Sequence, residues 1–306
     1  MVTAAYLRSS GCPVCGTSNF TSVISSSPPA EAADYSLIRS SWLGFFKRKI
    51  FFTYQRCLKC GILFTPIYLS DSALSDLYGA MPDNTAGLDK RYLEATQHGY
   101  FEFLSKHSSL SGDYFELGPD VGLFTKFVAA EQAVRKLWLY EPNRSVAQGL
   151  SLQTNGKPFE IRTEMNDFSA IPDGTLSTCV LIHVLDHLPD VRHVVMALRR
   201  KMSPEGRLLI VTHNEHSWPA RFFRHRWPAY CLQHPLLFNK TSTSSFLASV
   251  GFEVIETRNS VNVFPLTYLI KHFLYAMGIT SISDWNWSAF PIALRLGNIM
   301  TVAKPT

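Results

Sequence analysis

Two short segments combine residue types that bind a ribose-bearing ligand. In the first, an apolar run containing Glu116 precedes the tight turn Gly118-Pro-Asp-Val-Gly122. The turn leads into helical spacing at Phe124–Ala130, so backbone N–H groups and a positive helix end would lie beside the ligand. In the second, the apolar run Leu137–Tyr140 ends at Glu141. A carboxylate at this place can accept hydrogen bonds from both hydroxyls of an adenosyl ribose.

Four cysteines form two Cys-x-x-Cys-Gly knuckles, one at Cys12 and Cys15 and the other at Cys57 and Cys60. The glycine after each second cysteine permits a turn that directs both sulfurs to one point. Four thiolates form a closed tetrahedral zinc site with no open position for a substrate, so we predict a structural zinc ion. The alternatives are unmetallated turns with buried thiols or a redox pair, but neither knuckle follows a strand in a βαβ setting.

Histidines and acidic residues follow two further expected strands. His183 and His187 are four residues apart and Asp186 lies between them. Histidine titrates near neutral pH and a carboxylate can orient its ring, so this group is a candidate general base. The cluster His213-Asn-Glu215-His216 competes for that role. The structural alternatives are core packing by His183, capping by His187 and a solvated loop at the second cluster.

The composition is that of a folded protein, with 306 residues of which 46 % are apolar and 17 % charged. The net charge of +5 does not by itself indicate nucleic acid, which is not an expected partner. No signal peptide is visible, and no uncharged apolar run reaches the roughly 18 residues that a membrane span needs. Because four of the six cysteines form metal-binding knuckles, we expect a reducing, cytoplasmic location.

Strands and helices alternate from Tyr114 onward, which predicts a parallel sheet with helices on both faces. Ligands bind at the carboxyl ends of such strands, so the glycine turn, Glu141 and the histidines should share one edge. The expected strands are Tyr114–Leu117, Leu137–Glu141, Phe159–Arg162, Thr178–His183, Arg207–Thr212, Phe252–Phe264 and Asn298–Lys304. The expected helices include Leu123–Ala130, Arg144–Leu152, Val191–Met202 and Thr241–Val250.

The chain divides into three parts. Residues 1–69 are predicted to form the zinc ribbon, and residues 70–111 a linker with helices that could act as a lid. Residues 112–306 form the main α/β domain, with aromatic insertions at 213–240 and 265–295. The second insertion could be a lid, a dimer face or a helix on a membrane surface, and the sequence does not decide among them.

The first insertion contains the densest basic and aromatic stretch of the chain. Arg221, Arg224 and Arg226 alternate there with phenylalanine, histidine and tryptophan. Arginines on a diphosphate, with aromatic rings stacked on a base, would recognise a nucleotide-linked sugar. A surface helix with buried aromatic side chains explains the pattern equally well. The nearby Tyr230–His234 is a further cavity candidate, and the lone cysteines Cys179 and Cys231 are expected in the core.

These residues resemble the class I S-adenosylmethionine-dependent methyltransferases, in particular the subgroup with an N-terminal zinc ribbon, such as deoxysugar C-methyltransferases. The resemblance covers almost the whole chain and implies a Rossmann-like, mostly parallel seven-stranded sheet with helices on both faces. Five segments in the family's order carry it: Glu116–Gly122, Tyr140–Asn143, Asp167–Gly174, Cys179–Asp190 and Leu198–Ile210.

The resemblance implies S-adenosylmethionine as the cofactor and assigns roles to particular residues. Four parts of the chain would contact the cofactor. They are the acid and turn of the first motif, the ribose-binding acid with its neighbour, the adenine-binding acid with the side chain that covers the ring, and the end of the fourth strand. These are Glu116, Gly118, Asp120, Gly122, Glu141, Pro142, Asp167, Phe168 and His183. His187, His183, Asp186 and His216 are then the catalytic candidates. A histidine metal site is not favoured, because methyl transfer needs no metal.

One departure from the family pattern lies at Asp120, where the middle glycine of the first motif is expected. The acid could bind the ammonium group of the cofactor, or it could mark a catalytically silent binding module. A nicotinamide dinucleotide is disfavoured, because its motif would need glycine at Asp120 and Leu123. The resemblance favours methyl transfer to a small polar acceptor, a sugar or nucleotide-sugar, and leaves C- or O-transfer and monomer or homodimer open.

Overall fold

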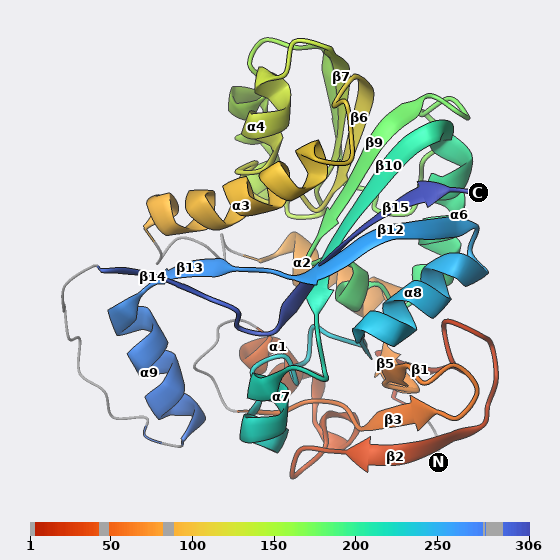
Figure 1. The fold of residues 1–306 in the computed structure, drawn as a ribbon. Coiled ribbons are helices and arrows are strands. Elements are labelled where there is room, and N and C mark those ends of the chain that lie inside the picture. The colour runs from red at the N-terminus through yellow and green to blue at the C-terminus, as the bar shows by residue number, and fades with distance from the viewer. Residues whose placement is uncertain (1–3, 43–48, 82–88, 278, 280–289) are drawn as a thin grey trace.

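The protein is built around a seven-stranded sheet, shown in a computed structural model that describes residues 4–42, 49–81, 89–277, 279 and 290–306 (Figure 1). The strand order is β12-β15-β10-β9-β6-β7-β8, and only β15 runs antiparallel to its neighbours. The strands are β6 (Gly112–Leu117), β7 (Val134–Tyr140), β8 (Phe159–Arg162), β9 (Leu176–Ile182), β10 (Met202–His213), β12 (Phe252–Asn259) and β15 (Asn298–Pro305). The predicted Rossmann-like sheet is therefore confirmed.

The sheet is buried on both faces because its central strands contain continuous apolar runs, such as Leu208–Val211 in β10. In β10, Leu208 and Ile210 belong to one core, whereas Leu209 and Val211 belong to the core on the opposite face. Successive side chains of a strand point to opposite faces, so a continuous apolar run supplies both layers. This explains why the apolar runs in the sequence locate the strands but carry no alternation.

Helices cover both faces of the sheet, as predicted. The long helix α3 and α4 contribute Tyr100, Phe103 and Val128 to one core, and α6 and α8 contribute Val194 and Phe246 to the other. Figure 1 shows the two pairs on opposite sides of the strands. The helices are α3 (Lys90–Ser105), α4 (Thr125–Ala130), α5 (Arg144–Ala147), α6 (Val191–Lys201) and α8 (Lys240–Ser249).

The N-terminal part forms a small four-stranded sheet with the order β11-β4-β3-β2. Strand β11 comes from the insertion at 213–240, so this insertion completes the N-terminal sheet instead of lying apart from it. A short pair, β1 with β5, and the helices α1 and α2 accompany the sheet. The elements are β1 (Leu7–Ser9), β2 (Phe20–Ile24), α1 (Tyr35–Ser41), β3 (Tyr54–Cys57), β4 (Leu63–Phe64), β5 (Ile67–Leu69), α2 (Asp71–Gly79) and β11 (Leu236–Leu237).

The four knuckle cysteines converge on one point. The Sγ atoms of Cys12 and Cys60 are 3.5 Å apart, as are those of Cys15 and Cys57. All four sulfurs lie within 4.8 Å of one another, and none of these cysteines forms a disulfide. Tetrahedral bonds of about 2.3 Å to zinc would place the sulfurs roughly 3.8 Å apart, so the four thiols fit this ion.

The closing part of the chain differs from the prediction. The single strand expected over Phe252–Phe264 is wrong, because β12 ends at Asn259 and β13 (Asn262–Pro265) pairs with β14 (Pro291–Leu294) in a separate sheet. Figure 1 shows this pair extending from the main sheet, with α9 (Leu266–Ala276) packed beside it. Residues 82–88 of the segment 70–111, which was expected to act as a lid, and residues 278 and 280–289 of the 265–295 insertion lie outside the described residues.

We predict that the purified protein contains about one zinc ion per chain and that Cys57→Ser removes it, since three thiolates cannot complete the tetrahedral site. Metal analysis by plasma mass spectrometry checks the stoichiometry, and thermal unfolding should show a lower melting temperature for the variant. Cys179→Ser, a substitution in the buried core far along the chain, serves as the control and should retain the metal. Zinc well below one per chain in the wild type would contradict the assignment.

Candidate active site

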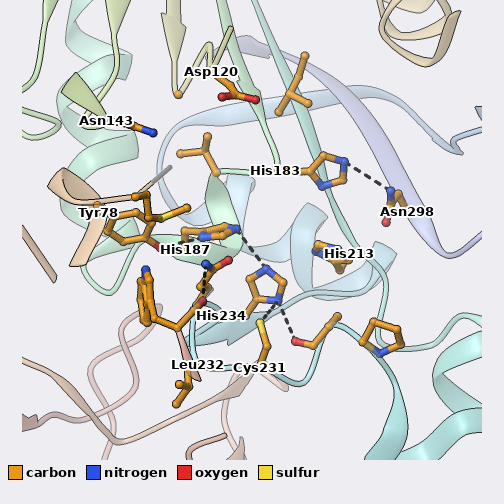
Figure 2. Close-up of a pocket in the computed structure, with 18 of the residues that line it drawn as sticks. Tyr78, Asp120, Asn143, His183, His187, His213, Cys231, Leu232, His234 and Asn298 are labelled. Atoms are coloured by element: carbon orange, nitrogen blue, oxygen red, sulfur yellow. Dashed lines mark hydrogen bonds between the residues drawn. The ribbon is translucent and has the colours of Figure 1, made fainter. Parts of the chain in front are cut away.

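A cavity of about 1670 Å³ lies where four parallel strands end. Gly118 follows β6, Glu141 follows β7, His183 follows β9, and His213 is the last residue of β10; all four line the cavity. The sheet edge therefore collects the residues that the sequence predicted to lie together. Figure 2 shows the histidine end of this cavity, with Asp120 above it and Cys231 and His234 below.

Glu141 connects the two ligand-binding segments. Its Oε2 accepts a hydrogen bond from the Asp120 backbone N–H at 2.8 Å, and its Oε1 accepts one from the Asn143 N–H at 2.8 Å. Burial raises the pKa of the Glu141 carboxyl to about 7, although these two hydrogen bonds act in the opposite direction. Each carboxylate oxygen retains a second lone pair for a ribose hydroxyl. The adjacent Pro142 also lines the cavity.

The turn Gly118–Gly122 has a left-handed backbone conformation at Asp120, where the family pattern has its middle glycine. Gly118, Asp120 and Gly122 have φ angles of 69°, 51° and 76°. A Cβ atom on Gly118 would lie 2.6 Å from the Val184 side chain, and one on Gly122 would lie 2.7 Å from Gln153, so both positions require glycine. Asp120 adopts the left-handed conformation that aspartate tolerates better than most residues. The substitution therefore leaves the turn intact.

Glu116 supports the turn from within the core. It is 2 % exposed, and its Oε2 accepts hydrogen bonds from the hydroxyls of Tyr114 at 2.8 Å and Thr125 at 2.6 Å. Burial raises its pKa to about 7, against the effect of these two donors. Because Thr125 begins α4, this carboxyl fixes the helix start behind the turn as well as contributing to the cavity wall.

The two residues predicted to contact adenine, Asp167 and Phe168, do not lie at the cavity. Phe168 is buried in the sheet core against Phe115 and Tyr140, and the Asp167 side chain accepts a hydrogen bond from Ser169 N at 2.9 Å on the surface. Neither of the two predicted residues lines the cavity. The segment just before them, Thr163-Glu-Met-Asn166, does so instead.

His213 is held by Asp186 at the opposite end of the cavity. The Asp186 Oδ2 contacts His213 Nδ1 and accepts the backbone N–H of His213 at 3.2 Å. Burial opposes ionisation of Asp186, but the neighbouring His213 outweighs it, and the pKa of this carboxyl lies well below its usual range. Among the described residues, no hydrogen-bond partner of His213 Nε2 is found, and a quarter of this side chain is exposed.

His183 faces the same space as a neutral ring. Burial and the nearby His213 lower the pKa of His183 to about 3. Its Nε2 lies 3.5 Å from Asn298 Nδ2, as Figure 2 shows, and its buried Nδ1 has no hydrogen-bond partner within the described parts of the chain. Its φ of 53° turns the chain sharply at the end of β9. An unpartnered buried nitrogen at this place is available to a bound ligand.

His187 lines the cavity, but protein groups hold both of its ring nitrogens. Its Nδ1 lies 2.8 Å from the Tyr78 hydroxyl and its Nε2 lies 3.1 Å from His234 Nε2 (Figure 2). Burial and the charge of His234 lower the pKa of His187 well below its usual value. Both ring nitrogens are therefore engaged, which restricts proton exchange with an acceptor.

His234 forms a buried pair with Cys231, 3.4 Å away. Burial disfavours the charge on each, but their mutual attraction prevails: the pKa of His234 is raised to about 9, and the pKa of the Cys231 thiol is lowered. Asp186, His213 and His234 are close enough to share one ion. However, the contacts with Cys231 and between His213 and Asp186 already pair these groups, so we assign no second metal to them.

Some of the predicted site residues lie at the cavity, but His216 does not, and other residues at the cavity were not predicted. His216 is half exposed beside Glu215 and does not line the cavity, whereas Glu215 is buried and pairs with Arg56 of β3. Tyr78 was missed, since it comes from α2 and carries no sequence signal. His234 was visible only as part of the aromatic stretch, and its position beside His187 follows from the insertion folding back over the sheet edge.

The chain matches the family described as "Methyltransferase domain" over residues 90–257. In fold it is similar to the YcgJ protein from Bacillus subtilis, with 14 % identity, a TM-score of 0.51, and coverage of 68 % of this chain and 98 % of that one. A putative methyltransferase from Bacillus halodurans gives 14 % identity and a TM-score of 0.51, covering 68 % and 99 %. An S-adenosylmethionine-dependent methyltransferase from Leishmania major gives 12 % and 0.50, covering 76 % and 82 %.

No curated protein sequence matches the chain. The solved structures are too distant in sequence to show more than the fold, and the family match carries the assignment. The residues around the cavity fit its cofactor, because the turn, the ribose acid Glu141 and the unpartnered His183 Nδ1 face one space at the strand ends. The chain therefore belongs to the methyltransferase-domain family, and it is a class I S-adenosylmethionine-dependent methyltransferase.

Proposed function

We propose that the protein methylates a hydroxyl or an acidic carbon of a small polar acceptor, a sugar or nucleotide-sugar, with His213 as the general base. The observation that carries this proposal is the contact between His213 and the fully buried Asp186 at the end of β10. Asp186 orients the ring through Nδ1, which leaves Nε2 for the acceptor. A carboxylate in this position also stabilises the imidazolium that forms when the ring takes a proton.

Each of these residues has a separate role in the reaction, which follows from where it lies in the cavity. S-adenosylmethionine supplies an electrophilic methyl group on its sulfonium sulfur when it is bound. Glu141 and the turn at Gly118 hold its adenosyl part, and His213 accepts the proton that the acceptor loses as the new bond to the methyl carbon forms. His183, neutral at physiological pH, donates or accepts one hydrogen bond to fix the reacting groups.

We propose His213 as the general base in place of His187, which was the first candidate from the sequence. The ring of His187 is bound on both sides by Tyr78 and His234, and removing a proton from an acceptor would require breaking one of these contacts. We propose that His187 is a positioning residue, which holds the loop carrying Asp186. His216 lies outside the cavity and has no role in this scheme.

Several features support a sugar-like acceptor. The cavity is also lined by the amide side chains of Gln97 and Asn298, which can bind hydroxyl groups, and by Tyr100, whose ring can pack on a sugar face. Of the three arginines predicted to bind a diphosphate, Arg226 lines the cavity, whereas the other two are exposed outside it. The resemblance to zinc-ribbon sugar methyltransferases points to the same acceptor class.

The silent binding module that the sequence left open is not supported. Its main argument was Asp120, but this residue adopts the backbone conformation of the turn and donates its N–H to Glu141.

The four free thiols of the zinc site also need a reducing environment, which supports the predicted cytoplasmic location. A screen of methyl transfer from labelled S-adenosylmethionine to nucleotide-sugars and glycans tests the acceptor; labelling confined to other acceptor classes would refute the sugar.

We expect Glu141→Gln to weaken S-adenosylmethionine binding by about ten- to a hundredfold, because a neutral amide replaces a charge-assisted acceptor of the ribose hydroxyls. In the wild type the affinity should increase as the pH rises through about 7, where Glu141 ionises, and this dependence should vanish in the variant. Calorimetry at several pH values measures both effects. Glu160→Gln, on β8 outside the cavity, is the matched control; equal affinity of wild type and Glu141→Gln would refute the assignment.

We expect His213→Ala to lower kcat by about a hundredfold or more while the cofactor affinity is kept, since the variant lacks the proton acceptor but not the ribose site. Asp186→Asn should lower kcat in the same direction by disturbing the ring's orientation. Single-turnover kinetics with a labelled methyl group measures these effects once an acceptor is found. His193→Ala, on the exposed face of α6, is the control.

The same series separates the two histidines. His187→Ala should lower kcat by less than about tenfold, because it acts only through the position of its neighbours. A hundredfold loss in His187→Ala with near-normal turnover in His213→Ala would return the base role to His187.

A further inference from the structure

Two helices of the insertions form one exposed apolar surface. In helix α7 (Trp218–Phe223), Trp218 is 61 % exposed and Phe222 is 58 % exposed. Phe273 of α9 is 48 % exposed, and Met277, which follows α9, is 46 % exposed. The helices touch: the rings of Phe223 and Phe273 are 6.0 Å apart. Arg226 also donates a hydrogen bond to the Met277 carbonyl at 3.1 Å. Because of these contacts, we treat Trp218, Arg221, Phe222, Arg224, Phe273 and Met277 as one surface, the α7–α9 face.

The α7–α9 face carries positive charge without acidic residues. Between Glu215 and Glu253 the sequence contains no Asp or Glu, and α9 has Lys271 but no acid. Arg221 and Arg224 are exposed, and neither forms an ion pair with a carboxylate that the structure describes. The partner of this face must therefore tolerate apolar side chains and supply negative charge.

An anionic membrane surface meets both requirements. Exposed aromatic side chains insert at the level of lipid headgroups, and each nearby arginine adds about fivefold to the affinity for anionic lipid. In a twofold dimer the same face would meet itself, and its arginines would repel one another without an acid to pair with. No described helix is long and apolar enough to cross a bilayer, and α9 has only 11 residues, so the contact is with the surface.

We propose that the protein docks on anionic phospholipid membranes through the α7–α9 face. Trp218 and Phe273 of this face also line the cavity, so the docked surface borders the space that contains His213. Docking thereby brings the active site next to the lipid headgroups. The proposal does not depend on the identity of the acceptor, and its test uses neither acceptor nor cofactor.

Co-sedimentation of the full chain with vesicles tests the proposal. We expect binding to vesicles of phosphatidylcholine with phosphatidylglycerol, weak binding to phosphatidylcholine alone, and loss of binding as salt is added. The double variant R221E/R224E should bind the anionic vesicles about twenty-five-fold more weakly or worse, at about fivefold for each arginine. W218S/F222S should weaken binding about tenfold, through lost insertion of the aromatic rings.

Two matched controls keep the comparison specific. Leu152→Ser changes an apolar side chain that is 83 % exposed elsewhere, and Arg200→Glu reverses an exposed charge on α6. Both should bind as the wild type does, and circular dichroism verifies that every variant is folded. The proposal is overturned by equal binding to neutral and anionic vesicles, by an equal loss in the controls, or by a solution dimer that W218S/F222S dissociates. Tight binding of duplex DNA that R221E/R224E abolishes would overturn it too.

Discussion

The whole active site depends on one buried carboxylate, that of Glu141, which binds two loops at once. Its oxygens accept the backbone N–H groups of Asp120 and Asn143, so the turn after β6 and the start of α5 are fixed relative to each other. A buried carboxylate is costly unless such donors compensate it, and the raised pKa reflects the remaining cost. We propose that the same oxygens accept the ribose hydroxyls, so that the group that binds the cofactor also shapes its pocket.

At the histidine end of the cavity, buried titratable groups also stabilise one another through direct contacts. Asp186 is fully buried and is tolerated there because His213 stands against it, while the neighbouring His187 is held neutral between Tyr78 and His234. Burial lowers the pKa of His183 and His187, whereas for His234 the attraction of Cys231 outweighs burial and raises the pKa. His213 combines an orientation fixed by Asp186 with a second ring nitrogen that has no partner among the described residues, and we therefore propose it as the base.

The sequence was sufficient for the parts of the site that follow strands. Each parallel strand delivers its next residue to the same edge, so Gly118, Glu141 and His183 could be placed together from apolar runs alone. Residues that arrive from other elements could not be placed in this way. Tyr78 lies on α2, and His234 reaches the edge only because β11 pairs with β4. Phe168, predicted to cover the adenine ring, packs in the sheet core instead of lining the cavity, because an apolar run does not show which face of the sheet a side chain serves.

The central claim is that Glu141 holds the adenosyl group at the edge of the sheet. A crystal structure of the protein with S-adenosylhomocysteine tests it most directly. The account predicts both ribose hydroxyls within hydrogen-bond distance of the Glu141 carboxylate, with the adenine against Glu164 and Met165 and the sulfur directed toward His183. A nucleoside bound elsewhere, or a ribose with no contact to Glu141, would contradict it.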